Sequence, residues 1–119
     1  MRLGGGLTEE GDSVKISILG VEYEVIRVPE SAHDPKMDGV YGYTEPWSKK
    51  IVYEAIEPKQ DTVEYPRMQE HKTLRHEIVH AFLIESGLDT CSSWARNEEV
   101  VDWIARQIPK MAKAMHEIG

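Results

Sequence analysis

Residues 73–82 read TLRHEIVHAF and contain the pattern H-E-x-x-H, with His76, Glu77 and His80 at its fixed positions. Apolar residues recur through and around this stretch at the three- and four-residue spacing of an amphipathic helix. Side chains four positions apart lie on one face of a helix, about 6 Å apart along its axis. The two imidazoles can therefore reach a common point, while the apolar face of the same helix is available for a core.

The chemistry of these three residues indicates a metal site. Neutral imidazole nitrogen is a preferred ligand of Zn²⁺, and catalytic zinc sites combine three protein ligands with a position open to water. Glu77 directly follows the first histidine, so we expect its carboxylate beside the metal, where it can take a proton from a metal-bound water. His76 and His80 are the expected zinc ligands, and Glu77 is the expected catalytic base. The alternative is a solvated helix face on which two histidines and a glutamate occur together.

A third protein ligand has to come from elsewhere in the chain. Residues 97–102 read NEEVVD, and either Glu98 or Glu99 could reach the metal from a second helix that faces the first. Asp102 follows Glu98 by four positions and therefore shares its helical face. A carboxylate placed behind a ligand histidine fixes the tautomer and the orientation of the imidazole.

Two helices are expected to carry these motifs. Pro66 suits the first position of the first helix, and Gly87 suits its C-terminal end. Residues 98–116 contain a second apolar face at helical spacing. Pro109 lies inside that pattern, so we expect the second helix to kink or split near Gln107.

Three strands are expected before the helices. Residues 14–19 and 21–28 alternate apolar and polar side chains, and Gly20 between them fits a hairpin turn. Residues 29–48 hold the prolines and glycines typical of a loop with turns. Residues 49–56 form the third expected strand, which its charged start places at the edge of the sheet. This order predicts an α+β fold, in which a three-stranded antiparallel sheet packs against the H-E-x-x-H helix and the second, glutamate-bearing helix.

Length and charge restrict the domain organisation and the partners that the chain can have. The 119 residues suffice for one domain, with residues 1–13 expected as a flexible tail and residues 14–119 as a single domain. The chain has 14 basic and 21 acidic residues and a net charge of −7, so nucleic acid is not an expected partner. No apolar run approaches the roughly 20 residues that span a bilayer, so no membrane contact is expected. The single Cys91 cannot form an internal disulfide, which favours a reducing, cytoplasmic location.

The two motifs together resemble those of the gluzincins, the thermolysin-like branch of zinc metallopeptidases, in which N-E-x-x-x-D follows H-E-x-x-H. The resemblance implies that Glu98 completes the metal site with the two motif histidines. It also implies that Asp102 supports His76 through a hydrogen bond, and it leaves Glu99 as the competing metal ligand.

The order of expected strands and motif-bearing helices over residues 39–108 is also similar to that of minigluzincins and of small phage and prophage proteins of the ImmA/IrrE type. This resemblance implies a small zincin-like domain of a phage protein that hydrolyses bonds in a peptide or protein substrate. In such enzymes an edge strand binds an extended peptide by backbone pairing. By resemblance, that strand would here contain Ile51, Val52, Tyr53 and Glu54. The helix that usually precedes the sheet in ImmA/IrrE-type proteins is not expected in this chain.

Three further points stay open in the sequence. The chain could instead be a catalytically silent metal-binding domain that acts in partner binding or regulation, or a latent peptidase whose segment after Pro109 covers the cleft. Nothing in the sequence indicates an oligomeric state. A hydrolase also needs a donor for the oxyanion of the reacting carbonyl. Candidate donors are Tyr41, Tyr43, Tyr53, His71 and His33.

Overall fold

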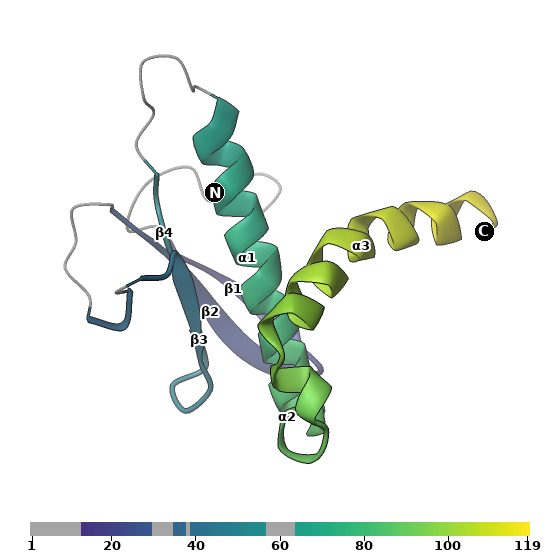
Figure 1. Cartoon of the computed structure of the whole chain (residues 1–119), viewed down its shortest axis with the longest axis horizontal. Helices are drawn as coiled ribbons and strands as arrows, with labels where there is room; N and C mark the ends of the chain where they lie inside the picture. The colour runs from purple at the N-terminus through teal and green to yellow at the C-terminus, as the bar shows by residue number, and fades with distance from the viewer. Residues whose placement is uncertain (1–12, 30–34, 38, 57–63) are drawn as a thin grey trace.

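Strands precede helices in the chain, which has the α+β composition that the sequence predicts. Figure 1 shows the elements of the computed structural model in chain order. The elements are β1 (Ser13–Ile18), β2 (Val21–Val28), the 3-10 turn η2 (Pro35–Met37), β3 (Gly42–Glu45), β4 (Lys50–Glu54), α1 (Glu64–Glu85), α2 (Leu88–Cys91), the 3-10 turn η3 (Ser93–Arg96) and α3 (Glu98–Glu117). The structure describes residues 13–29, 35–37, 39–56 and 64–119.

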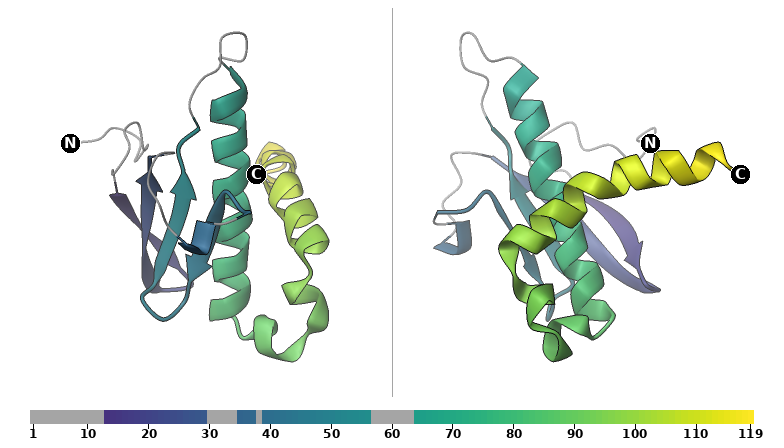
Figure 2. Two further views of the ribbon diagram at one scale, coloured as in Figure 1. Left: turned by 60° about the vertical axis from the view of Figure 1, so that its left-hand side comes forward. Right: turned by 45° about the vertical axis from the view of Figure 1, so that its right-hand side comes forward.

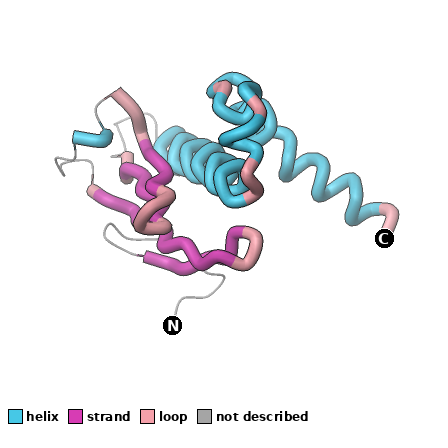
Figure 3. Tube along the Cα trace, turned by 90° about the horizontal axis from the view of Figure 1, so that it is seen from below, coloured by secondary structure: helices cyan, strands magenta, loops and turns pink. Residues whose placement is uncertain are grey.

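The sheet, α1 and α3 form three successive layers. Figure 2 shows α1 between the sheet and α3, and Figure 3 shows the strands gathered on one side of the helices. Because α1 lies in the middle layer, its apolar residues form two faces that point in opposite directions. The face toward the sheet packs into a cluster of Ile18, Tyr23, Val25, Ile51, Tyr53 and Ala81. The face toward α3 packs into a second cluster of Val79, Leu83, Ala95, Val101 and Ala105.

The sheet has four strands in the order β1-β2-β4-β3, so the prediction of three antiparallel strands is wrong in this detail. β1 and β2 form the predicted antiparallel hairpin, and β1 begins at Ser13, the only residue of the predicted tail that the structure describes. β4 runs parallel to β2, and β3 pairs antiparallel with β4. The missed strand lies within residues 29–48, where the glycines and prolines indicated only a loop.

The predicted edge strand is not at an edge. β4 pairs with β2 on one side and β3 on the other, so Ile51, Val52, Tyr53 and Glu54 lie inside the sheet. The first three of these side chains are buried, as a continuous apolar run in an inner strand should be. Among the described strands, β1 and β3 form the edges.

Gly42 allows β3 to lie very close to α1. A Cβ at this position would be 2.7 Å from Thr73 Cγ2 and 2.9 Å from the Val52 carbonyl oxygen. Contacts this short exclude a side chain, so the glycine is needed for the approach of backbone to helix. The close approach brings Thr44, two residues further along β3, against α1 as well.

The helix ends match the sequence pattern more closely than the strands do. α1 begins at Glu64, two residues before Pro66, and it stops before Gly87, whose φ of 86° is favourable for glycine. Asn97 caps α3, since its side-chain oxygen accepts a hydrogen bond of 3.0 Å from the Val100 N–H. α3 continues through Pro109 to Glu117, so the helix is not split, although it curves along its length (Figure 1).

Two polar contacts tie the two ends of α1 to the sheet. Arg27 donates two hydrogen bonds, of 2.8 and 3.1 Å, to the Glu70 carboxylate, which also accepts one from the Ile56 N–H. Near the other end, the Tyr23 hydroxyl and the Lys49 ammonium group both donate to Glu85 Oε2. These contacts fix the position of α1 along the sheet, and with it the residues between them. No helix among the described residues is both long and apolar enough to cross a bilayer.

We expect Gly42→Ala to destabilise the fold by about 1–3 kcal/mol, because the added methyl group forces β3 away from α1. Urea unfolding followed by circular dichroism measures the change. Ser17→Ala, at an exposed position of β1, is the control and should change the free energy of unfolding far less. Equal stability of Gly42→Ala and the wild type would contradict the close packing of β3 on α1.

Candidate metal centre

Two histidines of α1 and the first residue of α3 meet at one point. His80 Nε2 lies 3.1 Å from His76 Nε2 and 2.7 Å from Glu98 Oε1. His76 Nε2 lies 3.0 Å from the same Glu98 oxygen. His76, His80 and Glu98 thus form a group whose ligand atoms could hold a metal ion, as the sequence predicts.

The spacing of this group suits a metal ion with tetrahedral coordination. Ligand atoms about 2.0–2.1 Å from a tetrahedral zinc lie about 3.3 Å from one another, slightly more than the three distances found here. Two imidazole nitrogens and one carboxylate oxygen are a ligand set used by catalytic zinc sites. The histidine side chains are 18% and 17% exposed, whereas that of Glu98 is 72% exposed, so the group opens to solvent on the Glu98 side.

Helix packing brings the three ligands together. His76 and His80 lie one turn apart on α1, and Glu98 follows the Asn97 cap at the start of α3. The apolar cluster between the helices holds α3 against α1 close to these residues. The short α2 and η3 reverse the chain between them, so the end of α1 and the start of α3 are close neighbours (Figure 1).

Asp102 lies behind His76, one turn after Glu98. Its Oδ1 is 3.5 Å from His76 Nδ1, and its other oxygen forms an ion pair of 2.6 Å with Arg106. Partial burial acts to raise the pKa of Asp102, but the Arg106 guanidinium and the His76 ring outweigh it and lower this pKa. An ionised Asp102 favours a proton on Nδ1 of His76, which leaves Nε2 free to bind a metal.

The charge of Glu98 depends on the histidines. Partial burial alone would raise its pKa, but the two imidazoles attract and hydrogen-bond the carboxylate, and the net effect lowers the pKa. The ionised form is the one that binds a metal. The competing ligand Glu99 is exposed, and among the described residues the metal-binding group does not include it.

Glu77 lies next to His76 on α1, and its side chain points toward β3 of the sheet. Its side chain is buried, and Thr44 Oγ1 of β3 lies 2.9 Å from both its Oε1 and its backbone carbonyl oxygen. Burial raises the pKa of Glu77, and the Thr44 hydrogen bond and the two imidazoles partly offset this effect. Thr44 is not among the site residues that the sequence predicts, because residues 29–48 were expected to form a loop.

A cavity of about 230 Å³ connects these groups, since His76, Glu77 and Glu98 all line it. Its opposite wall is formed by Val40, Tyr41 and Gly42, at the start of β3. Tyr41 is thus the described oxyanion candidate that lines the cavity with Glu77. The other described oxyanion candidates do not line this cavity. Tyr53 is buried in the sheet core, and Tyr43 contacts Lys36. His71 lines a neighbouring groove, and His33 lies outside the described residues.

We expect purified protein to bind a single zinc ion, and both His80→Ala and Glu98→Gln to lose most of the affinity. Asp102→Asn should weaken binding by about 10–100-fold, because the ligand histidine loses its support. Isothermal titration with zinc measures these changes. Glu99→Gln is the matched control and should bind like the wild type, whereas a larger loss with Glu99→Gln than with Glu98→Gln would contradict this ligand set.

The chain matches no protein-family model, no curated protein and no solved structure. What the site can do is therefore inferred from the donors, distances and surroundings of its own side chains.

Proposed function

We propose that the chain is a zinc-dependent peptidase that hydrolyses peptide bonds. The supporting observation is that two members of the metal-binding group, His76 and Glu98, line the same cavity as the buried Glu77. A three-ligand group leaves a coordination position for water, whereas a purely structural zinc site is usually closed by four protein ligands.

Each residue has a defined task in this proposal. A zinc ion held by the three ligands would polarise the carbonyl of the scissile bond and make a water molecule more acidic. Glu77 accepts the proton of the attacking water and returns it to the leaving amine, so that no proton is lost or gained over the cycle. Thr44 holds the Glu77 carboxylate in place, and Tyr41 is positioned to donate a hydrogen bond to the oxyanion of the substrate.

A peptide substrate would pair with β3 rather than with β4. Because β4 lies inside the sheet, its backbone groups are already used by its two neighbours. β3 has a neighbour on one side only among the described strands, and the residues at its start line the cavity. An extended peptide paired with this edge would run past Glu77 and the metal ligands.

A silent or latent metal-binding domain is the alternative function. The C-terminal half of α3, which a latent form could use to cover the cleft, is exposed and projects away from the sheet (Figure 1). It therefore leaves the cavity accessible in this structure. A silent domain differs from a peptidase only in the absence of hydrolysis. A substitution of Glu77 separates the two, because it lowers the rate of hydrolysis only if the chain is a peptidase.

We expect Glu77→Gln to retain zinc but to hydrolyse peptides about 10²–10⁴-fold more slowly, because general acid–base catalysis is lost. A quenched fluorescent peptide library measures turnover, and zinc titration measures binding. Glu99→Gln serves as the control for an exposed glutamate near the site. Failure of the zinc-loaded wild type to cleave any library peptide would support the silent domain instead.

We expect Thr44→Val to lower kcat by about tenfold, because the Glu77 carboxylate loses the hydrogen bond that positions it. Thr44→Ser keeps the hydroxyl group and should restore most of the activity. Zinc affinity should stay unchanged in both variants, since Thr44 contacts no member of the metal-binding group. Equal kcat values for the valine and serine variants would show that the hydroxyl group does not position Glu77.

A further inference from the structure

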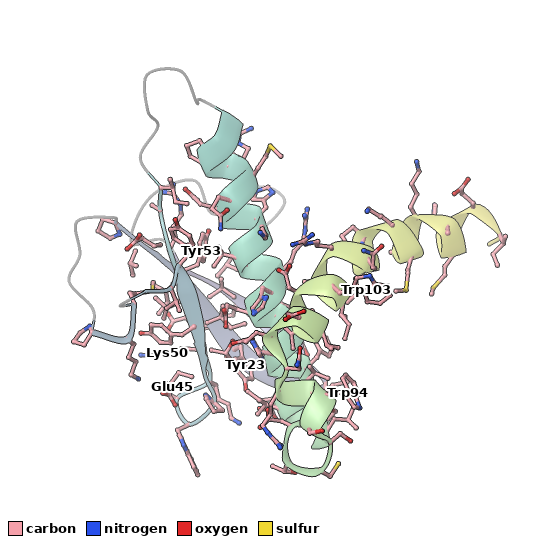
Figure 4. All side chains as sticks on the ribbon, viewed as in Figure 1. Tyr23, Glu45, Lys50, Tyr53, Trp94 and Trp103 are labelled. Atoms are coloured by element: carbon pink, nitrogen blue, oxygen red, sulfur yellow. The ribbon has the colours of Figure 1, made fainter. Side chains whose placement is uncertain are left out.

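A second, larger groove lies beside the metal cavity. It has a volume of about 660 Å³ and runs between the first half of α1 and the middle of α3. Figure 1 shows these parts of the two helices diverging, and Figure 4 shows nitrogen-bearing side chains reaching into the angle between them. We call this surface the basic groove, and the charged and titratable residues that line it are His71, Lys72, Arg75, Asp102, Arg106 and Lys110.

The groove has the opposite charge to the chain as a whole. The chain has a net charge of −7, yet the groove brings together four basic side chains and one carboxylate. Asp102 forms an ion pair with Arg106 and also interacts electrostatically with Lys72. Among the described residues, Lys72, Arg75 and Lys110 form no ion pair within 4.0 Å, so the positive charges of the groove outnumber its single carboxylate.

Helix geometry explains why these charges gather. Lys72 and Arg75 lie about one turn apart on α1, so they share a face. Arg106 and Lys110 are four residues apart on α3 and likewise share a face. The two faces meet in the groove, which concentrates the field of like charges along one path.

The basic groove adjoins the metal cavity. Gln69, Lys72 and Asp102 line both spaces, so the two share a border. A chain bound with one amide beside Glu77 would therefore place its neighbouring residues in the groove. The groove volume of about 660 Å³ lies within the range of sites that hold small ligands, which is room for several side chains.

We propose that the basic groove binds acidic side chains of the substrate, so that the chain acts on peptides with Asp or Glu on one side of the scissile bond. This inference rests on the proposed peptidase function. A peptide is favoured over a nucleic acid because the net charge of −7 repels a long polyanion, whereas a few carboxylates interact only with the local positive field. The groove also adjoins the cavity that we propose for peptide-bond hydrolysis, so a peptide can reach both spaces at once.

Binding to the Glu77→Gln protein tests this proposal separately from catalysis. The probes are two end-capped, fluorescein-labelled peptides, one of alternating Glu and Ser and one with Gln in place of each Glu. Fluorescence anisotropy at low salt measures both, first with EDTA so that no carboxylate can bind a metal, and then with zinc. We expect the acidic peptide to bind at least about tenfold more tightly than the neutral one, and its advantage to shrink at high salt.

Charge reversal locates the binding surface. Lys72→Glu combined with Arg75→Glu should reduce binding of the acidic peptide by about tenfold or more and leave the neutral peptide unaffected. Lys113→Glu, combined with Lys15→Glu so that the net charge changes by the same amount, is the matched control, because neither of these exposed lysines lines the groove. Circular dichroism establishes that each variant is folded.

Three results would overturn the proposal. Equal binding of the two peptides would show that the groove does not select acidic side chains. An equal loss in the control with Lys15→Glu and Lys113→Glu would place the effect in the overall charge and not in the groove. Tighter binding of a single-stranded oligonucleotide, abolished by the Lys72 and Arg75 reversals, would assign the groove to nucleic acid. Failure of the proposed peptidase function is detected by a different experiment, in which the zinc-loaded wild type would hydrolyse no library peptide.

Discussion

The packing of α3 against α1 is the contact on which the metal centre depends. Val101 and Ala105 of α3 are almost fully buried against Val79 and Leu83 of α1, within about two turns of the ligand residues. This apolar contact brings a carboxylate to within 3.0 Å of two imidazole nitrogens, an arrangement that polar side chains in water would not hold by themselves. A metal ion bound by all three groups would be a common partner for the two imidazole nitrogens and the carboxylate oxygen.

The two faces of α1 explain how adjacent residues acquire different surroundings. His76 faces α3, where the site is open to solvent through Glu98. Glu77, the next residue, faces β3, where burial and Thr44 surround its carboxylate. The helix therefore holds the candidate base and the candidate ligands at a fixed relative orientation, while a different layer of the protein supports each of them.

Most of the helical half of the site could be predicted from the sequence, because it depends on local geometry. The spacing of His76 and His80 already defines a shared helical face, and Gly87 marks the end of α1 by its own backbone chemistry. The juxtaposition of Glu98 with the histidines could be expected only from the resemblance of the two motifs, since it depends on how two helices pack.

The sheet half was much less predictable. β3 is only four residues long and begins with Gly42, whose role becomes visible only when Thr73 of α1 lies against it. The apolar run along β4 carries no information about strand direction, so its parallel pairing with β2 could not be inferred. Thr44 could not be identified because β3 itself was expected to be a loop. The basic groove could not be predicted either, since it depends on how the faces of two helices lie relative to each other.

The metal-binding group is the central claim, and anomalous X-ray diffraction at the zinc edge tests it most directly. Crystals grown with zinc should give an anomalous peak about 2 Å from His76 Nε2, His80 Nε2 and a Glu98 oxygen, with a position left for water. A well-occupied zinc peak at another place in the protein, with these three side chains turned away from one another, would contradict the claim.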